Sequence, residues 1–331
     1  MGEIWRATKE GEGGWRKEVA LKVILPTFSA EERFIEMFLA EARIAALLDH
    51  PNIVSVFAAG REAGLCWFEQ EYVCGEDLAR ILRRLPRGFP LPLALFVAAE
   101  SLKALSYAHE CRGPEGKPLG IIHRDVKPHN LLLAKEGHVK LGDFGIAKLT
   151  TQAAASVSEL KGTAGYIAPE LLDGAPASVR SDLFSAGLVL WELLTGRRLF
   201  DAEADAARLK RTYECVIPPL REVGVEASPE VESLVGCLLA RNPDQRFGSA
   251  AEALAAVLAL PRGREASSFE LKRFLSEVAP VDTVPEFAPT VPSDRDAVPS
   301  DRDAVPSDRD AVPEYIHDVD GRAVGRQRDI P

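Results

Sequence analysis

Asn130 and Asp143 bring oxygen atoms to the two ends of a segment whose pattern predicts a β-hairpin. The segment reads NLLLAKEGHVKLGDFG, and its apolar runs at 131–134 and 138–141 predict two strands joined by a glycine-containing turn. Pairing of these strands places Asn130 opposite Asp143 at the open end of the hairpin. A carboxylate and a neutral oxygen suit Mg²⁺, which keeps further positions for phosphate oxygens and water. The hairpin therefore predicts a site for a metal ion bound to phosphate.

The stretch just before this hairpin, HRDVKPHN at 123–130, adds two charged groups. Asp125 is a candidate proton acceptor, and Lys127 is a candidate counter-charge for a phosphate group. Taken alone, Asp-Phe-Gly or His-Arg-Asp could be an ordinary polar turn. Their combination around one hairpin predicts phosphate chemistry.

A lysine in a predicted strand could serve the same site. Side chains alternate along the strand at 19–24, so Ala20 and Lys22 share one face. The small Ala20 leaves room for a flat ligand over the strand. A lone strand lysine is more often an edge charge, so Lys22 needs a partner before it indicates a site.

Glu41 is a candidate partner for Lys22. A capping-box pattern at 29–32 predicts a helix that runs to about Leu48, and Glu41 lies on its apolar stripe between Met37 and Ala45. A carboxylate on a buried face is costly unless it is paired, which favours an ion pair with Lys22. The alternative is a helix edge that lets Glu41 reach water.

The bulk composition is that of a soluble globular protein. The chain has 331 residues, of which 46% are hydrophobic and 27% charged. The net charge of −10 argues against a nucleic-acid binder, although not against a local basic patch. No apolar run approaches the length of a membrane span, and the start lacks the apolar region of a signal peptide.

The five cysteines are odd in number and scattered, and no two of them form a CxxC pair. This pattern favours reduced thiols over a zinc site or a disulfide framework. We therefore expect a cytoplasmic protein.

The chain divides into three zones. Residues 1–260 alternate apolar strand and helix patterns, and 261–279 contain a predicted amphipathic helix with the sequence SSFELKRFLSEV. Residues 280–331 contain VPSDRDA three times in tandem. A coiled coil is excluded because each unit has a proline and no second large apolar residue. With 12 acidic and 6 basic residues, this tail is expected to be disordered, as a spacer or as a partner-binding segment.

Ordered motifs along residues 1–260 resemble those of the bacterial serine/threonine protein kinases. VALK lies at 19–22, HRDVKPHN and DFG lie on either side of the hairpin, and APE lies at 168–170. The resemblance implies an α+β, bilobal kinase fold with a β-rich N-lobe at 1–73 carrying one helix. It also implies a larger helical C-lobe at 74–260.

The resemblance assigns catalytic roles to four charged residues. Lys22 holds the α- and β-phosphates of ATP, and Glu41 is its helix partner. Asp125 accepts or orients the proton of the substrate hydroxyl, and Lys127 contacts the γ-phosphate.

The cofactors implied are ATP and Mg²⁺, with Asn130 and Asp143 as the metal ligands. The adenine edge would meet the backbone of Glu71 and Val73, next to a gatekeeper at Gln70. The remaining nucleotide contacts implied by the resemblance are Gly2, Ile4, Ala20, Asp77 (or its neighbour Glu76) and Leu132.

The glycine-rich loop of the family is incomplete in this sequence. Gly2 aligns with its third glycine and Ile4 with its valine, while the first two glycines and the strand before them are absent. We expect a start codon placed inside the loop, with about 15–30 residues upstream. The alternative is a truncated chain that binds ATP poorly and acts as a scaffold.

The resemblance implies an ATP-dependent kinase that phosphorylates protein Ser/Thr hydroxyls, with a catalytically impaired scaffold as the alternative. Lys127, two residues after Asp125, and Thr163 fit the serine/threonine pattern. Arg124 would receive a phosphate from the activation loop. The candidate autophosphorylation sites in that loop are Thr150, Thr151, Ser156 and Ser158. Protein substrates are the implied partners, a dimer remains open, and neither nucleic acid nor a membrane is expected.

Overall fold

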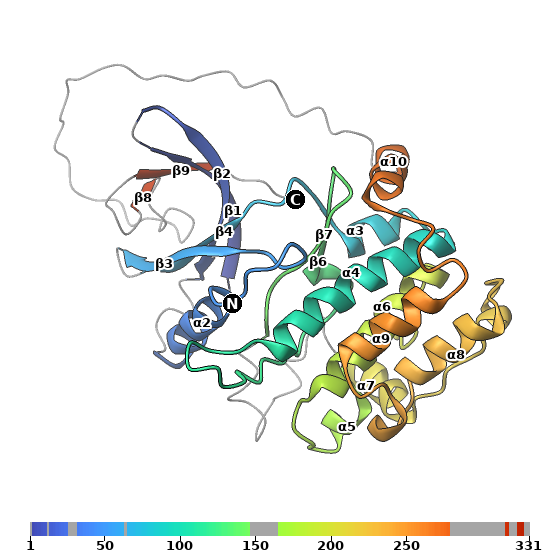
Figure 1. The fold of residues 1–331 in the computed structure, drawn as a ribbon. Coiled ribbons are helices and arrows are strands. Elements are labelled where there is room, and N and C mark those ends of the chain that lie inside the picture. The colour runs from blue at the N-terminus through green and yellow to red at the C-terminus, as the bar shows by residue number, and fades with distance from the viewer. Residues whose placement is uncertain are drawn as a thin grey trace, which may run out of the picture.

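The computed structural model shows two lobes, one built on a sheet and one on helices (Figure 1). This confirms the bilobal α+β fold that the motifs predict. The residues that the structure describes are 2–11, 13–25, 32–62, 65–145 and 165–278, together with the backbone of two strands at 315–317 and 323–327.

The N-lobe is an antiparallel sheet. Four of its strands pair in the order β3-β4-β2-β1, with the bounds β1 (Gly2–Glu10), β2 (Arg16–Ile24), β3 (Val56–Glu62) and β4 (Leu65–Glu71). β1 and β2 form a ribbon whose register runs from Gly2 opposite Ile24 to Glu10 opposite Arg16. Gly13 (φ 85°) supplies the left-handed conformation that its turn requires.

Two further strands extend this sheet beyond β1. They are β8 (Tyr315–His317) and β9 (Ala323–Gln327), and β9 pairs antiparallel with β1. The sequence analysis did not predict these strands. The rest of the predicted tail, from 279 to 331, lies outside the described residues.

Helix α2 (Glu32–Ala45) covers one face of the sheet. Its Ile35 and Phe38 pack against Ile24 and Phe68, and the rings of Phe38 and Phe68 are 5.0 Å apart. The predicted capping box at 29–32 lies largely outside the described residues. The packing fixes α2 beside β2, the strand that carries Lys22.

The C-lobe is mainly helical. Its helices are α3 (Leu78–Arg83), α4 (Leu91–Glu110), α5 (Pro169–Leu172), α6 (Val179–Thr195), α7 (Asp205–Glu214), α8 (Pro229–Leu238), α9 (Ala250–Ala259) and α10 (Ser268–Val278). A small antiparallel sheet joins them, with β5 (Gly75–Asp77), β6 (Leu131–Ala134) and β7 (Val139–Leu141). β6 and β7 are the predicted hairpin, with Leu131 opposite Leu141.

Helix α6 forms the centre of the C-lobe, and every residue from Ser181 to Thr195 is buried. A capping box formed by Ser178 and Ser181 starts the helix, and Gly196 in the left-handed conformation ends it. Because α6 is buried on all sides, no polar face marks where the helix begins and ends. The capping contacts at its two ends define these limits instead.

Within the described residues, α4 is the one helix long and apolar enough to cross a membrane by length and composition. Its residues Leu95, Leu102 and Leu105 are completely or almost completely buried in the C-lobe core. The apolar character of α4 is therefore accounted for by packing against α6 and α9.

Helix α10 packs against the other C-lobe helices through Leu271 and Leu275, which are buried in the main core. Its Phe274 ring lies 5.1 Å from that of Phe89. The backbone of Ser268 lies so close to Gly137, in the β6–β7 turn, that a Cβ there would clash. The helix therefore contacts the side of the hairpin away from the predicted metal ligands.

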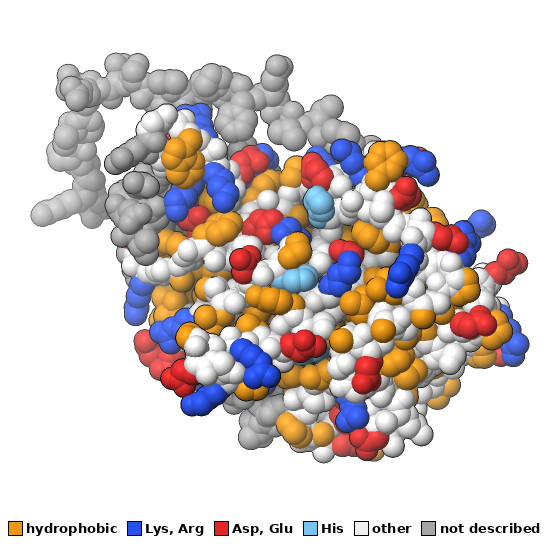
Figure 2. All heavy atoms as spheres, in the orientation of Figure 1, with side chains coloured by type: hydrophobic (Ala, Val, Ile, Leu, Met, Phe, Trp, Pro, Cys, Tyr) orange, Lys and Arg blue, Asp and Glu red, His pale blue; other side chains and the backbone are white. Residues whose placement is uncertain are grey.

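Figure 2 shows acidic and basic side chains interspersed on this view of the surface, without a broad area of one sign.

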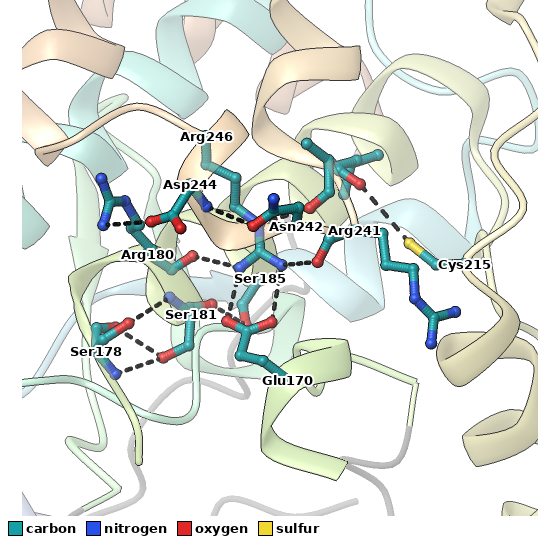
Figure 3. Close-up of polar contacts among 12 residues, drawn as sticks. Glu170, Ser178, Arg180, Ser181, Ser185, Cys215, Arg241, Asn242, Asp244 and Arg246 are labelled. Carbon is teal, nitrogen blue, oxygen red and sulfur yellow. Dashed lines mark hydrogen bonds and ion pairs between the residues drawn. The ribbon is translucent and has the colours of Figure 1, made fainter. Parts of the chain in front are cut away.

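A buried ion pair joins Glu170, the last residue of the APE motif at 168–170, to Arg246 (Figure 3). The guanidinium of Arg246 donates two hydrogen bonds to Glu170, at 2.7 and 2.8 Å. It also donates to the carbonyl oxygens of Arg180 and Ala240. The two hydrogen bonds make the pair bidentate, and it is largely desolvated because the Arg246 side chain is fully buried and that of Glu170 is 13% exposed.

We expect Arg246→Met to lower the free energy of unfolding by about 3–5 kcal/mol, because it leaves Glu170 without its partner. Asp244→Ala is the matched control, since it removes only the exposed pair between Asp244 and Arg180 and should cost less than about 1 kcal/mol. Denaturant unfolding of both variants measures the difference. Equal losses in the two variants would contradict the assignment of Arg246 as a buried anchor.

Candidate active site

Lys22 lies between two carboxylates from different parts of the chain. Its Nζ is 2.7 Å from Glu41 Oε1 on α2 and 2.8 Å from Asp143 Oδ1 after β7. Both Lys22 and Glu41 side chains are 13% exposed, so Glu41 does not turn to water at the helix edge. Burial alone would lower the pKa of Lys22, but Asp143 and Glu41 raise it above its ordinary value. The lysine is therefore a permanent cation held in place.

The catalytic-loop residues contact one another. Lys127 Nζ lies 2.8 Å from Asp125 Oδ2, and the Asn130 amide donates to the Asp125 carbonyl and carboxylate at 2.8 and 3.1 Å. Asp125 and Asn130 are thus fixed relative to each other by the short 3-10 turn Pro128–Asn130. The structure brings these three side chains together just before the start of β6.

Asp182 on α6 anchors the backbone of this loop. Its carboxylate accepts hydrogen bonds from the N–H groups of His123 (2.7 Å) and Arg124 (2.8 Å), and it lies 2.8 Å from His109 Nε2. Arg124 has a φ of 67°, which is uncommon for a residue with a side chain. The backbone strain is therefore held by a completely buried carboxylate, close to Asp125.

The segment after β7 is tied to the same loop. Gly142 N–H donates to the Asn130 carbonyl, and Gly145 N–H donates to the His123 carbonyl, both at 2.9 Å. Asp143 adopts the left-handed conformation with φ 54°, which turns its side chain toward Lys22. Burial would raise the pKa of Asp143, but Lys22 holds it below its ordinary value. Asp143 is therefore ionised at neutral pH.

The contacts of His123 define its protonation state. Its Nε2 lies 3.1 Å from the Gly142 carbonyl, and its Nδ1 accepts from the Asp125 N–H at 3.2 Å. A ring that donates from one nitrogen and accepts at the other is neutral. Burial lowers the pKa of His123 below its ordinary value of 6.5, in agreement with this tautomer. His123 therefore links the DFG segment to the loop as a neutral bridge.

This bridge predicts a pH dependence of stability. The unfolded chain takes up a proton on the imidazole near pH 6.5, whereas the folded chain does so only at lower pH. Protons therefore favour unfolding, and the free energy of unfolding should fall below pH 6.5, by up to about 1.4 kcal/mol per pH unit from this group. Chemical denaturation at pH 7.5, 6.5 and 5.5 should show a smaller slope in His123→Gln. An identical slope in that variant would contradict the prediction.

The predicted metal ligands fit Mg²⁺. Because both hydrogen bonds of Asn130 to Asp125 use its amide nitrogen, its oxygen is the group left for a cation. Asp143 adds an ionised carboxylate. Among the described residues, no cluster of three or more His, Cys, Asp and Glu side chains could hold a metal by itself. Two oxygen ligands suit a Mg²⁺ ion that also binds phosphates and water.

The strand register gathers the predicted nucleotide contacts on one face of the sheet. Ile4 pairs with Lys22, and Ala20 pairs with Gln70, so these four residues share the face toward α2 and Asp143. Ile4 is 47% exposed, so its side chain is accessible to a ligand on this face of the sheet. Gly2 lies at the start of the same strand.

The remaining predicted contacts lie where the two lobes join. Glu71 ends β4, Val73 follows it, and Leu132 pairs with Asp77 in the small sheet. Both carboxylate oxygens of Asp77 interact with Arg80, one as the N-cap of α3. If Asp77 binds the ribose of a nucleotide, the same carboxylate also caps α3 and pairs with Arg80.

A contact that the sequence analysis missed joins the same region to β7. Lys140 Nζ lies 2.8 Å from Glu71 Oε2, and this carboxylate also accepts from the Ser55 N–H. In a sequence, charged residues that alternate along a short strand look like solvent-exposed positions. The pair of Lys140 and Glu71 is therefore recognisable only from the fold. The predicted loop residues Thr150, Thr151, Ser156, Ser158 and Thr163 lie outside the described residues.

A buried lysine held between a helix carboxylate and Asp143, at the junction of a sheet lobe and a helical lobe, is the arrangement that the kinase fold provides. Residues 2–258 match the family model for the protein kinase domain. The chain belongs to the protein kinase family.

Bacterial kinases are among the relatives. The chain is 37% identical over 281 residues to the tyrosine-protein kinase MasK of Myxococcus xanthus, covering 84% of this chain and 41% of MasK. It is 36% identical over 270 residues to the serine/threonine-protein kinase PknA of Mycobacterium tuberculosis, covering 80% of this chain and 59% of PknA. The chain therefore spans less than two thirds of either relative.

A solved structure shows the same fold. The crystal structure of the Mycobacterium tuberculosis PknI kinase domain superposes with a TM-score of 0.56 at 29% identity. The match covers 77% of this chain and 89% of that domain. Both lobes of the fold are thus those of a protein kinase.

Proposed function

We propose that this chain transfers the γ-phosphate of ATP to Ser and Thr hydroxyls of proteins. The observation that carries the proposal is the assembled site, in which Lys22 binds Glu41 and Asp143 while Asp125 and Asn130 hold each other. Protein kinases need these groups in place together before transfer. The same assembly gives no support to the alternative of an impaired scaffold.

In the proposed reaction, the substrate hydroxyl oxygen forms a bond to the γ-phosphorus as the bond to the β–γ bridging oxygen breaks. Asp125 takes the hydroxyl proton, and ADP leaves with the bridging oxygen. Lys22 neutralises the α- and β-phosphates, and Lys127 moves from Asp125 to the γ-phosphate. Mg²⁺, when held by Asn130 and Asp143, supplies charge neutralisation of the phosphate oxygens.

The choice of Ser/Thr over Tyr rests on the loop sequence and on relatives. Lys127 lies two residues after Asp125, which fits the serine/threonine pattern, and its contact with Asp125 supports this assignment. PknA and the Bacillus subtilis kinase PrkC (32% identical, 71% of this chain, 35% of that protein) are named serine/threonine kinases, whereas MasK is named a tyrosine kinase. We therefore propose Ser and Thr as the acceptor residues, in agreement with the loop sequence.

Incubation with Mg²⁺ and γ-labelled ATP, followed by phosphoamino-acid analysis, tests this choice. We expect phosphoserine and phosphothreonine on the chain itself and on a general protein substrate, and no label with Asp143→Ala. Label on tyrosine alone would overturn the Ser/Thr assignment. A well-folded chain that binds ATP but transfers nothing would favour the scaffold.

We further propose a cytoplasmic location. The five cysteines are free in the structure, and Cys74 is exposed. Free thiols, including an exposed one, are typical of a reducing compartment. Fractionation of cells followed by detection of the chain tests this location, and recovery of the chain outside the cytoplasm would contradict it.

A further inference from the structure

Helix α10 lies beyond the residues that match the kinase family, yet it is packed into the C-lobe. The family match covers residues 2–258, whereas α10 spans Ser268–Val278. Leu271 is completely buried and Leu275 is 6% exposed, and both belong to the main core. A helix that buries its apolar face in this way is a fixed part of the domain, so its contacts with the rest of the fold can carry a role.

Local contacts fix where α10 begins and how it follows α9. The Ser267 hydroxyl accepts a hydrogen bond from the Phe269 N–H at 3.2 Å, and Glu270 accepts one from the Ser267 N–H at 3.0 Å, which is the reciprocal pattern of a capping box. In the connection from α9, a Cβ on Gly263 would clash with the Val257 carbonyl. Helices as short as α10 are marginal on their own in water, so α10 depends on these contacts and on its packing.

The first turn of α10 meets the turn of the β6–β7 hairpin (Figure 1). Gly137, with a φ of 86°, lies in this hairpin turn. A Cβ there would clash with the Ser268 carbonyl oxygen and lie 2.9 Å from the backbone nitrogen of Lys272. Glycine therefore serves two needs at position 137, because it adopts the left-handed conformation and lets the backbone of α10 approach the turn.

The same hairpin turn holds the segment that joins the two lobes. The Lys135 N–H donates to the Cys74 carbonyl at 2.8 Å, and Gly75 pairs with Ala134 in the small sheet. Cys74 directly follows Val73, whose backbone is a predicted contact of the adenine ring. A continuous path of backbone contacts thus runs from α10 through the turn to the adenine end of the predicted nucleotide site.

The open end of the hairpin is held by other contacts. The Gly142 N–H donates to the Asn130 carbonyl at 2.9 Å, and the Leu141 N–H donates to the Asn52 carbonyl at 2.8 Å. The Leu141 carbonyl in turn accepts from the Val54 N–H at 3.0 Å. None of these contacts involves α10. The end of the hairpin that carries the predicted metal ligands is therefore fixed independently of this helix.

We propose that α10 is a positioning element for nucleotide binding: through the β6–β7 turn, it holds the Cys74–Gly75 segment in the conformation that receives the adenine ring. Leu271 and Gly137 are then positioning residues on the two sides of one contact. The proposal rests on the proposed ATP-dependent function. Because only the adenine end of the site depends on α10, release of the helix should weaken ATP binding and leave the transfer step unchanged.

Hydrogen exchange of the full-length chain without nucleotide tests the link from α10 to the hinge. Leu271→Ala, which removes the most buried anchor of α10, should raise the exchange rate of the Lys135 amide by about tenfold or more while the amides of α6 stay protected. Phe269→Ala is the matched control, because this residue lies on the same helix and is 67% exposed. Phe274→Ala, a milder change in the same helix, replaces Leu271→Ala if that variant also loses protection of α6. Unchanged Lys135 exchange would overturn the proposal.

Gly137→Ala disrupts the same contact from the side of the hairpin. Gly224→Ala is its control for backbone strain, because Gly224 also has a φ of 86° but no atom within 4 Å of its Cβ position. We expect weaker Mg-ATP binding in Gly137→Ala and wild-type binding in Gly224→Ala. Since Gly137→Ala and Leu271→Ala release one contact, the double variant should bind no more weakly than the weaker single variant. Additive losses in the double variant would overturn the proposal.

Calorimetry with Mg-ATP and steady-state kinetics give the functional readout. Leu271→Ala and Gly137→Ala should each raise the Kd of Mg-ATP and the KM for ATP by about three- to tenfold, with kcat within about twofold of the unaltered chain. A fall in kcat with an unchanged KM would overturn the positioning role. If the unaltered chain binds Mg-ATP and the variants bind it equally well, the inference fails and the proposed function stands. If the unaltered chain does not bind Mg-ATP, the proposed function fails and the positioning role fails with it.

Discussion

Asp125→Asn should lower kcat for phosphoryl transfer by about 10²–10⁴-fold while changing the KM for ATP by less than about threefold. Asp125 is bonded to Lys127 and Asn130, whereas Lys22 is bonded to Glu41 and Asp143. The asparagine oxygen can still accept from the Asn130 amide, so the loop should keep its shape. The loss then reports removal of the proton acceptor, which steady-state kinetics with ATP and a protein substrate measures.

Asp244→Asn is the control for this experiment. Asp244 is 81% exposed in the C-lobe, so the same change of atoms there should leave kcat unaltered. Thermal unfolding of the three proteins shows whether Asp125→Asn stays folded. A folded Asp125→Asn enzyme with wild-type kcat would remove Asp125 from the reaction.

The local parts of the site were predictable because each rests on a short pattern. The hairpin at 131–141 follows from two apolar runs around a glycine turn, and its register alone brings Asn130 near Asp143. Glu41 was recognisable because a carboxylate on an apolar helix stripe needs a partner. Lys22 was the matching cation, and the structure forms the predicted ion pair.

The contacts that escaped prediction join distant segments without a local pattern. β9 has the sequence AVGRQ, whose glycine and polar residues are weak strand formers, and it pairs with residues more than 300 positions earlier. The pair of Lys140 with Glu71 likewise depends on how the two sheets meet. The neutral tautomer of His123 needs the positions of both ring partners, which no spacing encodes.

Lys22→Met should lower kcat/KM for ATP by about 10²–10³-fold. The lysine is the cation that faces the nucleotide from β2, and methionine keeps its length but not its charge. The same change leaves the carboxylates of Glu41 and Asp143 beside each other without the cation between them, and like charges at close range disfavour ionisation of both. The loss therefore includes misplacement of Asp143, a predicted metal ligand. Calorimetric titration with Mg-ATP and steady-state kinetics measure the two parts.

A double-mutant cycle with Glu41→Gln separates the ion pair from simple loss of charge. If Glu41 acts by holding Lys22, Glu41→Gln should lower kcat/KM in the wild-type background and have little further effect in Lys22→Met. Lys22→Arg should not restore activity, because a planar guanidinium cannot place one nitrogen at 2.7 Å from Glu41 and 2.8 Å from Asp143 in the same geometry. Additive losses in the cycle would show that Glu41 and Lys22 act separately. In that case the buried pair would be a structural contact, and the positioning of Lys22 would depend on Asp143 alone.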